Sequence, residues 1–102
     1  MNVQNDICRA IAGHNQVTFY YDGGHRTVEP HMVAYLKTTG ALTLSAWFLT
    51  GTSKSGSGQG WRQYSLSKIE HLTVDANTFA GPRPDYQSDG GKVFRDVVCA
   101  LP

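Results

Sequence analysis

The spacing of apolar residues changes once along this chain, from a helical period to a period of two. Near the N-terminal end, apolar residues recur at helical spacing, which predicts a short amphipathic helix over residues 4–13. The residues that define this pattern are Val3, Ile7, Ala10 and Ile11. Gly13 is a suitable stop, because glycine readily adopts the left-handed conformation that ends many helices.

Beyond this helix, apolar and polar residues alternate in short segments rich in β-branched and aromatic side chains, which predicts β-strands. The expected strands cover residues 16–22, 25–38, 41–51, 61–66 and 70–74. Asp22, Gly23 and Gly24 separate the first two as a hairpin turn, since glycine tolerates the positive φ of tight turns. Pro30 donates no ladder hydrogen bond, so the second strand should lie at an edge or carry a bulge.

The clearest alternation is in ALTLSAWFLTG, where Leu42, Leu44 and Phe48 share one face and Trp47 lies on the other. Residues 52–60 contain no apolar side chain and are predicted to form a mobile loop. The chain should leave the sheet at residues 78–87, and the tail after residue 87 fits a helix or a strand. One helix followed by about five short antiparallel strands indicates a mainly β protein, closed as a small barrel.

Length and composition are those of an ordinary folded protein. The 102 residues suffice for a single domain, and 40% hydrophobic with 17% charged residues is typical of globular proteins. No apolar run approaches the roughly 18 residues of a membrane helix, and the N-terminal segment lacks the apolar stretch of a secretory signal. We therefore predict one cytoplasmic domain over residues 1–102, outside any membrane. In a reducing compartment, Cys8 and Cys99 are expected to be buried free thiols.

Charge is unevenly distributed, although the net charge is only +1. From Arg26 to Lys68 the sequence contains five cations and a single acid, Glu29. A chain with so little net charge has no general attraction for polyanions, so any such attraction must be local. The central segment is where we expect a local site.

The order of several motifs resembles that of the WYL domain family, small barrels with an SH3-like or Sm-like fold found in bacterial transcription regulators and in CRISPR-associated and phage-defence proteins. The matching segments are the helix, the strand ending in Tyr21, and then RTVEPHMV, LTLSAWFLTG, WRQYSLSKI and TFAGPRPDY. They cover residues 4–86, which leaves 87–102 as a C-terminal extension. The motif that names the family falls on Leu42, Thr43 and Leu44, so two of its three residues differ, and Lys68 stands where an arginine is usual.

This resemblance implies a ligand-sensing domain that binds single-stranded nucleic acid or a nucleotide-like anion through a basic and aromatic pocket, in transcription regulation or phage defence. Carried over position by position, it points to Tyr21, Arg26, His31, Arg62 and Lys68. The residue pattern adds Trp47 as an aromatic candidate. The alternative is a protein-interaction module that self-associates or docks onto a larger regulator, with Trp47 and Trp61 as anchors.

The strongest of these candidates, Arg62, has two interpretations. It shares a face of its strand with Tyr64, so an inward Tyr64 carries Arg62 inward too. There the arginine would pair with Glu29 or Glu70, or it would await an anion, which a planar guanidinium binds through two parallel hydrogen bonds.

The other candidates have structural alternatives as well. Lys68 at a strand end and Arg26 after a turn could both be solvated at the surface. His31 follows a proline where the strand should be irregular, so its ring could be turned toward a ligand, or it could be exposed or cap the backbone. Tyr21 alternates with core positions and should be partly buried, and Trp47 could form a second packing surface or an exposed stacking platform.

No metal, cofactor or catalytic centre is expected. The histidines and cysteines lack the close spacing of zinc ligands. The serines of GTSKSGSGQG lie in a loop without the strand-to-helix elbow that exposes a nucleophile, and GSGQG is not followed by the lysine and helix of a phosphate-binding loop. We expect a binding protein and not an enzyme.

Overall fold

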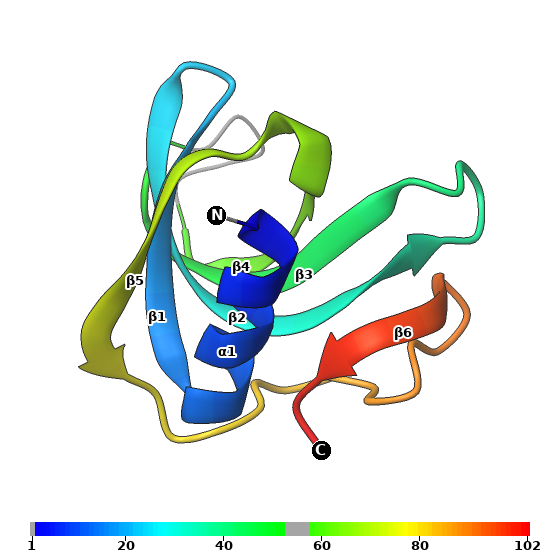
Figure 1. Cartoon of the computed structure of the whole chain (residues 1–102). Helices are drawn as coiled ribbons and strands as arrows, with labels where there is room; N and C mark the ends of the chain where they lie inside the picture. The colour runs from blue at the N-terminus through cyan, green and yellow to red at the C-terminus, as the bar shows by residue number, and fades with distance from the viewer. Residues whose placement is uncertain (1, 53–57) are drawn as a thin grey trace.

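The computed structural model describes residues 2–52 and 58–102 and shows one helix packed against a strongly curved β-sheet (Figure 1). The elements of this part of the chain are α1 Val3–Gly13, β1 Asn15–Tyr21, β2 Gly24–Leu36, β3 Leu42–Gly51, β4 Gly60–Ser65, the short 3-10 helix η1 Leu66–Lys68, β5 Glu70–Thr78 and β6 Phe94–Ala100. The predicted mainly β architecture with one N-terminal helix is confirmed. Most of the predicted loop at 52–60 consists of residues 53–57, which lie outside the described residues.

In the described part of the chain the strands form one antiparallel sheet, and the closure into a small barrel that the sequence predicted is not found. Its strands follow the order β4-β3-β2-β1-β5, and β6 pairs with β2 beside this path. Within the described residues no pairing joins β4 to β5, so these two strands end the path. The 3-10 turn η1 separates them and directs β5 toward β1. The sheet thus has one strand more than the five predicted, because the C-terminal tail supplies β6.

The long strand β2 is the centre of the sheet and changes partners along its length. Its first part pairs with β1, its last part pairs with β6, and β3 runs along its other side. Pro30 pairs with Ala46 and Met32 pairs with Ser45, so His31 is the extra residue of a bulge. The predicted bulge is confirmed, whereas the alternative of an edge strand is wrong.

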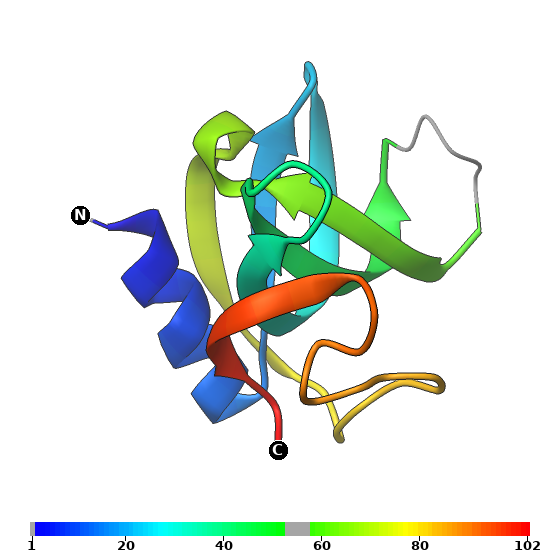
Figure 2. The same cartoon turned by 90° about the vertical axis from the view of Figure 1, so that its right-hand side faces the viewer.

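The helix buries one face and is capped at both ends. The side chain of Asn2 accepts a hydrogen bond from the backbone N–H of Asn5. Helical pattern residues Ile7 and Ile11 are buried, and α1 contacts β1, β2, β5 and β6 at the side of the sheet (Figure 2). The left-handed residue that ends the helix is His14 (φ 55°), and Gly13 is the last helical residue. No helix in the described part of the chain is long and apolar enough to cross a membrane.

The hairpin predicted at residues 22–24 is confirmed. Asp22 and Gly23 both have positive φ (50° and 78°), and Tyr21 pairs with Gly24 across the turn. Tyr20 is exposed, whereas Tyr21 is partly buried and packs against the core, as the alternation predicts.

The C-terminal part of the chain returns to the sheet as a strand. Residues 79–93, called the strap below, leave the sheet after β5 as predicted and lead to β6 (Figures 1 and 2). β6 runs antiparallel to the end of β2, pairing Phe94 with Leu36 and Ala100 with Met32. The ambiguous tail is therefore a strand where it pairs, and it places Leu101 in the core.

The prediction of two free thiols is wrong. Cys8 of α1 and Cys99 of β6 form a disulfide with a Cα–Cα distance of 5.8 Å. The two residues are 91 positions apart, and they meet because β6 pairs with β2 beneath the helix. Disulfides persist mainly in oxidising compartments, so the cytoplasmic location stays a prediction that this bond does not favour.

Candidate functional site

Two arginines and three aromatic rings gather on the inner face of the curved sheet. We call these five residues the basic-aromatic cluster: Tyr21, Arg26, Phe48, Arg62 and Tyr64. They belong to β1, β2, β3 and β4, which are neighbours in the sheet. Alternation along each strand explains the arrangement, since Arg26 shares its face with the core residue Val28, and Tyr64 is itself buried.

The aromatic side chains of the cluster pack edge to face. The ring of Tyr64 lies 5.0 Å from Phe19 and 5.0 Å from Tyr21, centre to centre, with interplanar angles near perpendicular. The hydroxyl of Tyr21 accepts a hydrogen bond from the backbone N–H of Ser65 at 3.0 Å. These contacts fix the orientation of both tyrosines beside the arginines.

Arg26 is a buried cation. The residue is 4% exposed, and its guanidinium carbon lies 5.8 Å from the centre of the Tyr21 ring. Its positive charge acts on the Tyr64 hydroxyl and lowers the pKa of that group. Its Nη1 is buried and has no hydrogen-bond partner among the described residues, and none of their carboxylates pairs with it. The surface alternative for Arg26 is therefore excluded.

Arg62 lies on the same face of β4 as Tyr64, as its position in the strand predicts. Its guanidinium carbon is 5.3 Å from the centre of the Phe48 ring. Its Nη1 donates to the carbonyl of Trp61 at 2.9 Å, and its Nη2 donates to the carbonyl of Gly58 at 3.0 Å. These contacts hold the side chain at the edge of the cluster, where Arg62 is half-buried.

The charges of both arginines affect the pKa of the Tyr64 phenol. Burial raises its pKa, and the positive charges of Arg26 and Arg62 oppose that rise. The strand pairs Val28–Phe48 and Ala46–Arg62 place both arginines on the same side of the sheet, because paired residues and residues two apart share a face. Because burial raises its pKa, Tyr64 stays a neutral phenol, although its surroundings carry positive charge.

Comparison with known proteins gives no family for this chain. No family model, curated protein or solved structure matches it. The interpretation of its site therefore rests on the residues themselves.

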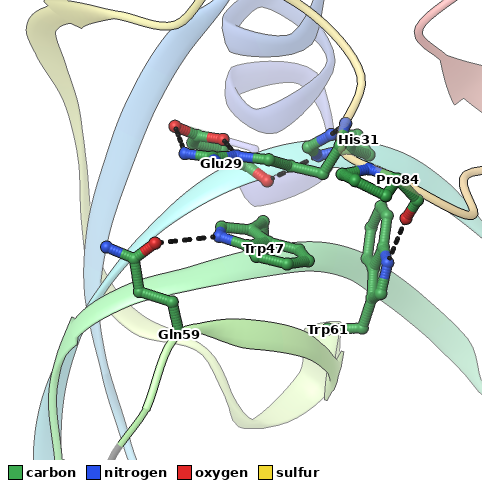
Figure 3. A network of polar contacts seen from close by, with 7 residues as sticks. Glu29, His31, Trp47, Gln59, Trp61 and Pro84 are labelled. Carbon is green, nitrogen blue, oxygen red and sulfur yellow. Dashed lines mark hydrogen bonds and ion pairs between the residues drawn. The ribbon is translucent and has the colours of Figure 1, made fainter.

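The outer face of the sheet carries a separate polar network (Figure 3). Arg83 of the strap donates from Nε and Nη2 to the two carboxylate oxygens of Glu29, at 2.7 and 3.0 Å. The Arg83 guanidinium also lies 5.1 Å from the ring centre of Trp47, whose Nε1 donates to Gln59. Glu29, which could have paired with Arg62, is occupied by Arg83 instead.

His31 is buried at 0% exposure and lies in this outer network. Its Nε2 accepts a hydrogen bond from the backbone N–H of Arg83 at 3.1 Å, so Nδ1 carries the proton and donates to the Glu29 carbonyl at 2.8 Å. Its ring stacks on Phe79. Burial is the main cause that lowers the pKa of His31, which keeps the ring neutral. Both ring nitrogens are used within the fold, and the exposed alternative is excluded.

The predicted site residues thus separate into three places. Tyr21, Arg26 and Arg62 come together in the basic-aromatic cluster, whereas His31 and Trp47 lie in the outer network. Lys68 ends η1 and is exposed, and no described residue forms an ion pair with it. Among the described residues no group of three or more histidine, cysteine or acidic side chains could hold a metal ion.

Sequence reasoning missed three residues that shape these places. Phe48 was predicted on the apolar face of its strand and Tyr64 only as an inward possibility; both are buried, Phe48 lies under Arg62, and Tyr64 lies near the charges of both arginines. The alternation that put Arg62 beside Tyr64 was a usable signal for this. Arg83 had no such signal, because its partner Glu29 is 54 positions away and meets it only through the path of the strap.

Proposed function

We propose that the basic-aromatic cluster is an anion-binding site, and that the chain is a ligand-binding module of the WYL type for single-stranded nucleic acid or a nucleotide-like anion. The observation that carries this proposal is Arg26, a buried guanidinium with an unpartnered Nη1 and no carboxylate partner among the described residues. The proposed role is binding without a chemical step.

The physical argument begins with the cost of burying a charge. Removing a guanidinium from water is unfavourable unless hydrogen bonds and an opposite charge compensate it. In Arg26 the Tyr21 ring and the Tyr64 hydroxyl provide part of that compensation. A phosphate oxygen at Nη1 would complete it, because guanidinium groups bind phosphate through charge-assisted hydrogen bonds.

The rest of the cluster suits a nucleotide more than a bare anion. Arg62 adds a second guanidinium at the edge, where it is partly accessible. Tyr21 offers an aromatic face of the kind on which nucleobases stack. Since Nη1 of Arg26 is covered in this conformation, we expect the side chains that cover it to shift when a ligand reaches it.

A fluorescence titration with short single-stranded oligonucleotides tests the proposal. We expect saturable binding by the wild-type protein that weakens as the salt concentration rises, because phosphate contacts release counterions. The Arg26→Met variant should bind at least tenfold more weakly and show a shallower salt dependence. Arg9→Met serves as the matched control, since Arg9 is exposed on α1 away from the cluster.

Two results would remove the proposal. One is the absence of saturable binding by the wild-type protein at low salt. The other is equal binding by Arg26→Met and Arg9→Met, which would mean that general surface charge attracts the oligonucleotide.

A further inference from the structure

A pocket of about 490 Å³ opens on the outer face of the sheet, between the strap and strands β2, β3, β4 and β6. This volume falls in the range of small-molecule sites. Met32 and Phe94 provide buried apolar surface, and Trp61 and Tyr86 provide aromatic walls. The pocket is distinct from the basic-aromatic cluster, although Arg62 borders both.

The aromatic walls are held in place by hydrogen bonds within the fold. The Nε1 of Trp61 donates to the carbonyl of Pro84 at 2.8 Å (Figure 3). The hydroxyl of Tyr86 donates to the carbonyl of Leu101 at 2.7 Å. The two rings are nearly parallel, with an interplanar angle of 19° and centres 6.2 Å apart. Walls fixed in advance lower the entropic cost of binding a flat ligand.

Polar side chains surround these walls: Ser45, Gln63, Gln87 and Asp85. The position of Gln87 depends on Gly91, because a β-carbon there would lie 1.8 Å from the Gln87 side-chain oxygen. Each glutamine amide offers a donor and an acceptor in one plane. Such a pair matches the edge of a planar heterocycle, as glutamine does when it contacts adenine.

The charges around the pocket disfavour an anion there. No described residue forms an ion pair or hydrogen bond with the carboxylate of Asp85. The guanidinium of Arg62 donates to backbone carbonyls and lies against Phe48, on the inner side of β4. A phosphate would meet the Asp85 carboxylate, whereas an amino or imino group would donate to it.

We infer that this pocket binds one uncharged nucleobase, with its flat face against Trp61 and Tyr86 and its polar edge at Gln63, Gln87 and Asp85. That the base belongs to the same strand whose phosphate reaches Arg26 rests on the proposed function. The pocket itself does not need that link, because a free nucleoside carries the same ring and edge.

Nuclear magnetic resonance titration with adenosine, cytidine, guanosine and uridine tests the inference on ¹⁵N-labelled protein. We expect saturable shifts of the Trp61 indole N–H and of the Gln63 and Gln87 side-chain amides. Gln63→Leu should weaken binding by about fivefold to a hundredfold, the range for loss of one paired amide contact. The matched control Gln16→Leu on β1 should stay within twofold of the wild type.

A second variant addresses the edge of the base. Asp85 has φ 71°, a conformation that asparagine tolerates, so Asp85→Asn should fold normally. It should change the order of affinity among the four nucleosides, because an acceptor becomes partly a donor. Glucose should leave the same signals unchanged.

Three results would overturn the inference: no nucleoside shifts these signals, Gln63→Leu binds as Gln16→Leu does, or glucose saturates the same signals. The same measurements distinguish a failure of this inference from a failure of the proposed anion-binding site. Arg26→Met should leave nucleoside binding intact, so nucleoside binding without oligonucleotide binding would refute only the cluster. Salt-dependent oligonucleotide binding without nucleoside binding would refute only the pocket.

Discussion

At the scale of single residues, the charges of Arg83 on the outer face of the sheet and of Arg26 on its inner face are compensated by different partners. Arg83 on the outer face meets a carboxylate through two hydrogen bonds. Arg26 on the inner face lies against the Tyr21 ring, and its charge acts on the Tyr64 hydroxyl. A buried charge compensated only in part lowers stability, which is why such groups often mark binding sites.

The first prediction concerns the stability cost of Arg26. Replacing it with methionine removes a partly compensated charge and keeps most of the apolar side chain. We expect Arg26→Met to raise the free energy of unfolding by about 1 kcal/mol in phosphate-free buffer. Urea unfolding measures this, with Arg9→Met expected to change stability by less than about 0.5 kcal/mol. A clear loss of stability in Arg26→Met would show that its charge is well compensated within the fold.

The second prediction concerns pH and His31. Its pKa is lowered in the folded protein, mainly by burial, so protons bind the unfolded chain first as the pH falls. The free energy of unfolding should be constant above the ordinary histidine pKa of about 6.5 and should fall below it, by up to about 1.4 kcal/mol per pH unit. Urea unfolding between pH 5 and 8, roughly that window, measures the slope.

His31→Gln provides the control for this assignment, because glutamine is neutral at every pH in the window. The variant should lose part of the slope below pH 6.5, roughly the ordinary histidine pKa. If the slope is unchanged, the other histidines cause it and the neutral state of His31 plays no part.

At the scale of elements, the strap and β6 complete the fold by returning to the sheet at fixed points. His31, Glu29 and Trp61 each bind the strap through a hydrogen bond to Arg83 or Pro84. The side chain of Glu29 is 5% exposed, and that of Arg83 is 35% exposed. The pair is therefore only partly shielded from solvent, and its loss should have a moderate cost.

The third prediction tests this anchor. Arg83→Met leaves the Glu29 carboxylate buried without its partner, and we expect a loss of about 1.5–3 kcal/mol in the free energy of unfolding. Adding Glu29→Gln should restore part of that loss, because a neutral amide tolerates the site better. Additive effects of the two substitutions would contradict a direct interaction.

The fourth prediction concerns the disulfide between α1 and β6. Closing a loop of 91 positions restricts the unfolded chain, and such bonds typically contribute about 2–5 kcal/mol. Treatment with a reductant should lower the free energy of unfolding by that amount in the wild type. A Cys8→Ala/Cys99→Ala double variant should be insensitive to reductant. Free thiols labelled in the untreated folded protein would contradict the bond.

At the scale of the whole molecule, local sequence patterns predicted most of the helices and strands but not the long-range contacts between them. Alternation identified β1 to β5 and the hairpin at Asp22, because side-chain parity is a local property of strands. The place of β6 and the Cys8–Cys99 bond depend on long-range pairing with β2. No local pattern carries that information, so the tail stayed ambiguous and the thiols were predicted to be free.

The candidate site follows the same division. The inward position of Arg62 was predicted from Tyr64, its neighbour in the alternation. That Arg26 joins it, and that His31 does not, depends on which strands are adjacent and on the bulge in β2. The resemblance indicated the residue types of a site, whereas strand alternation and the bulge in β2 placed them on two faces of the sheet.

The most direct test of the anion site is the stabilisation of the protein by pyrophosphate, measured by urea unfolding at constant ionic strength. A ligand that binds the folded state at a hundred times its dissociation constant adds about 2.7 kcal/mol to the free energy of unfolding. We predict that pyrophosphate stabilises the wild type and Arg9→Met to a similar extent and leaves Arg26→Met unchanged. Equal stabilisation of all three proteins, or of none, would contradict the account.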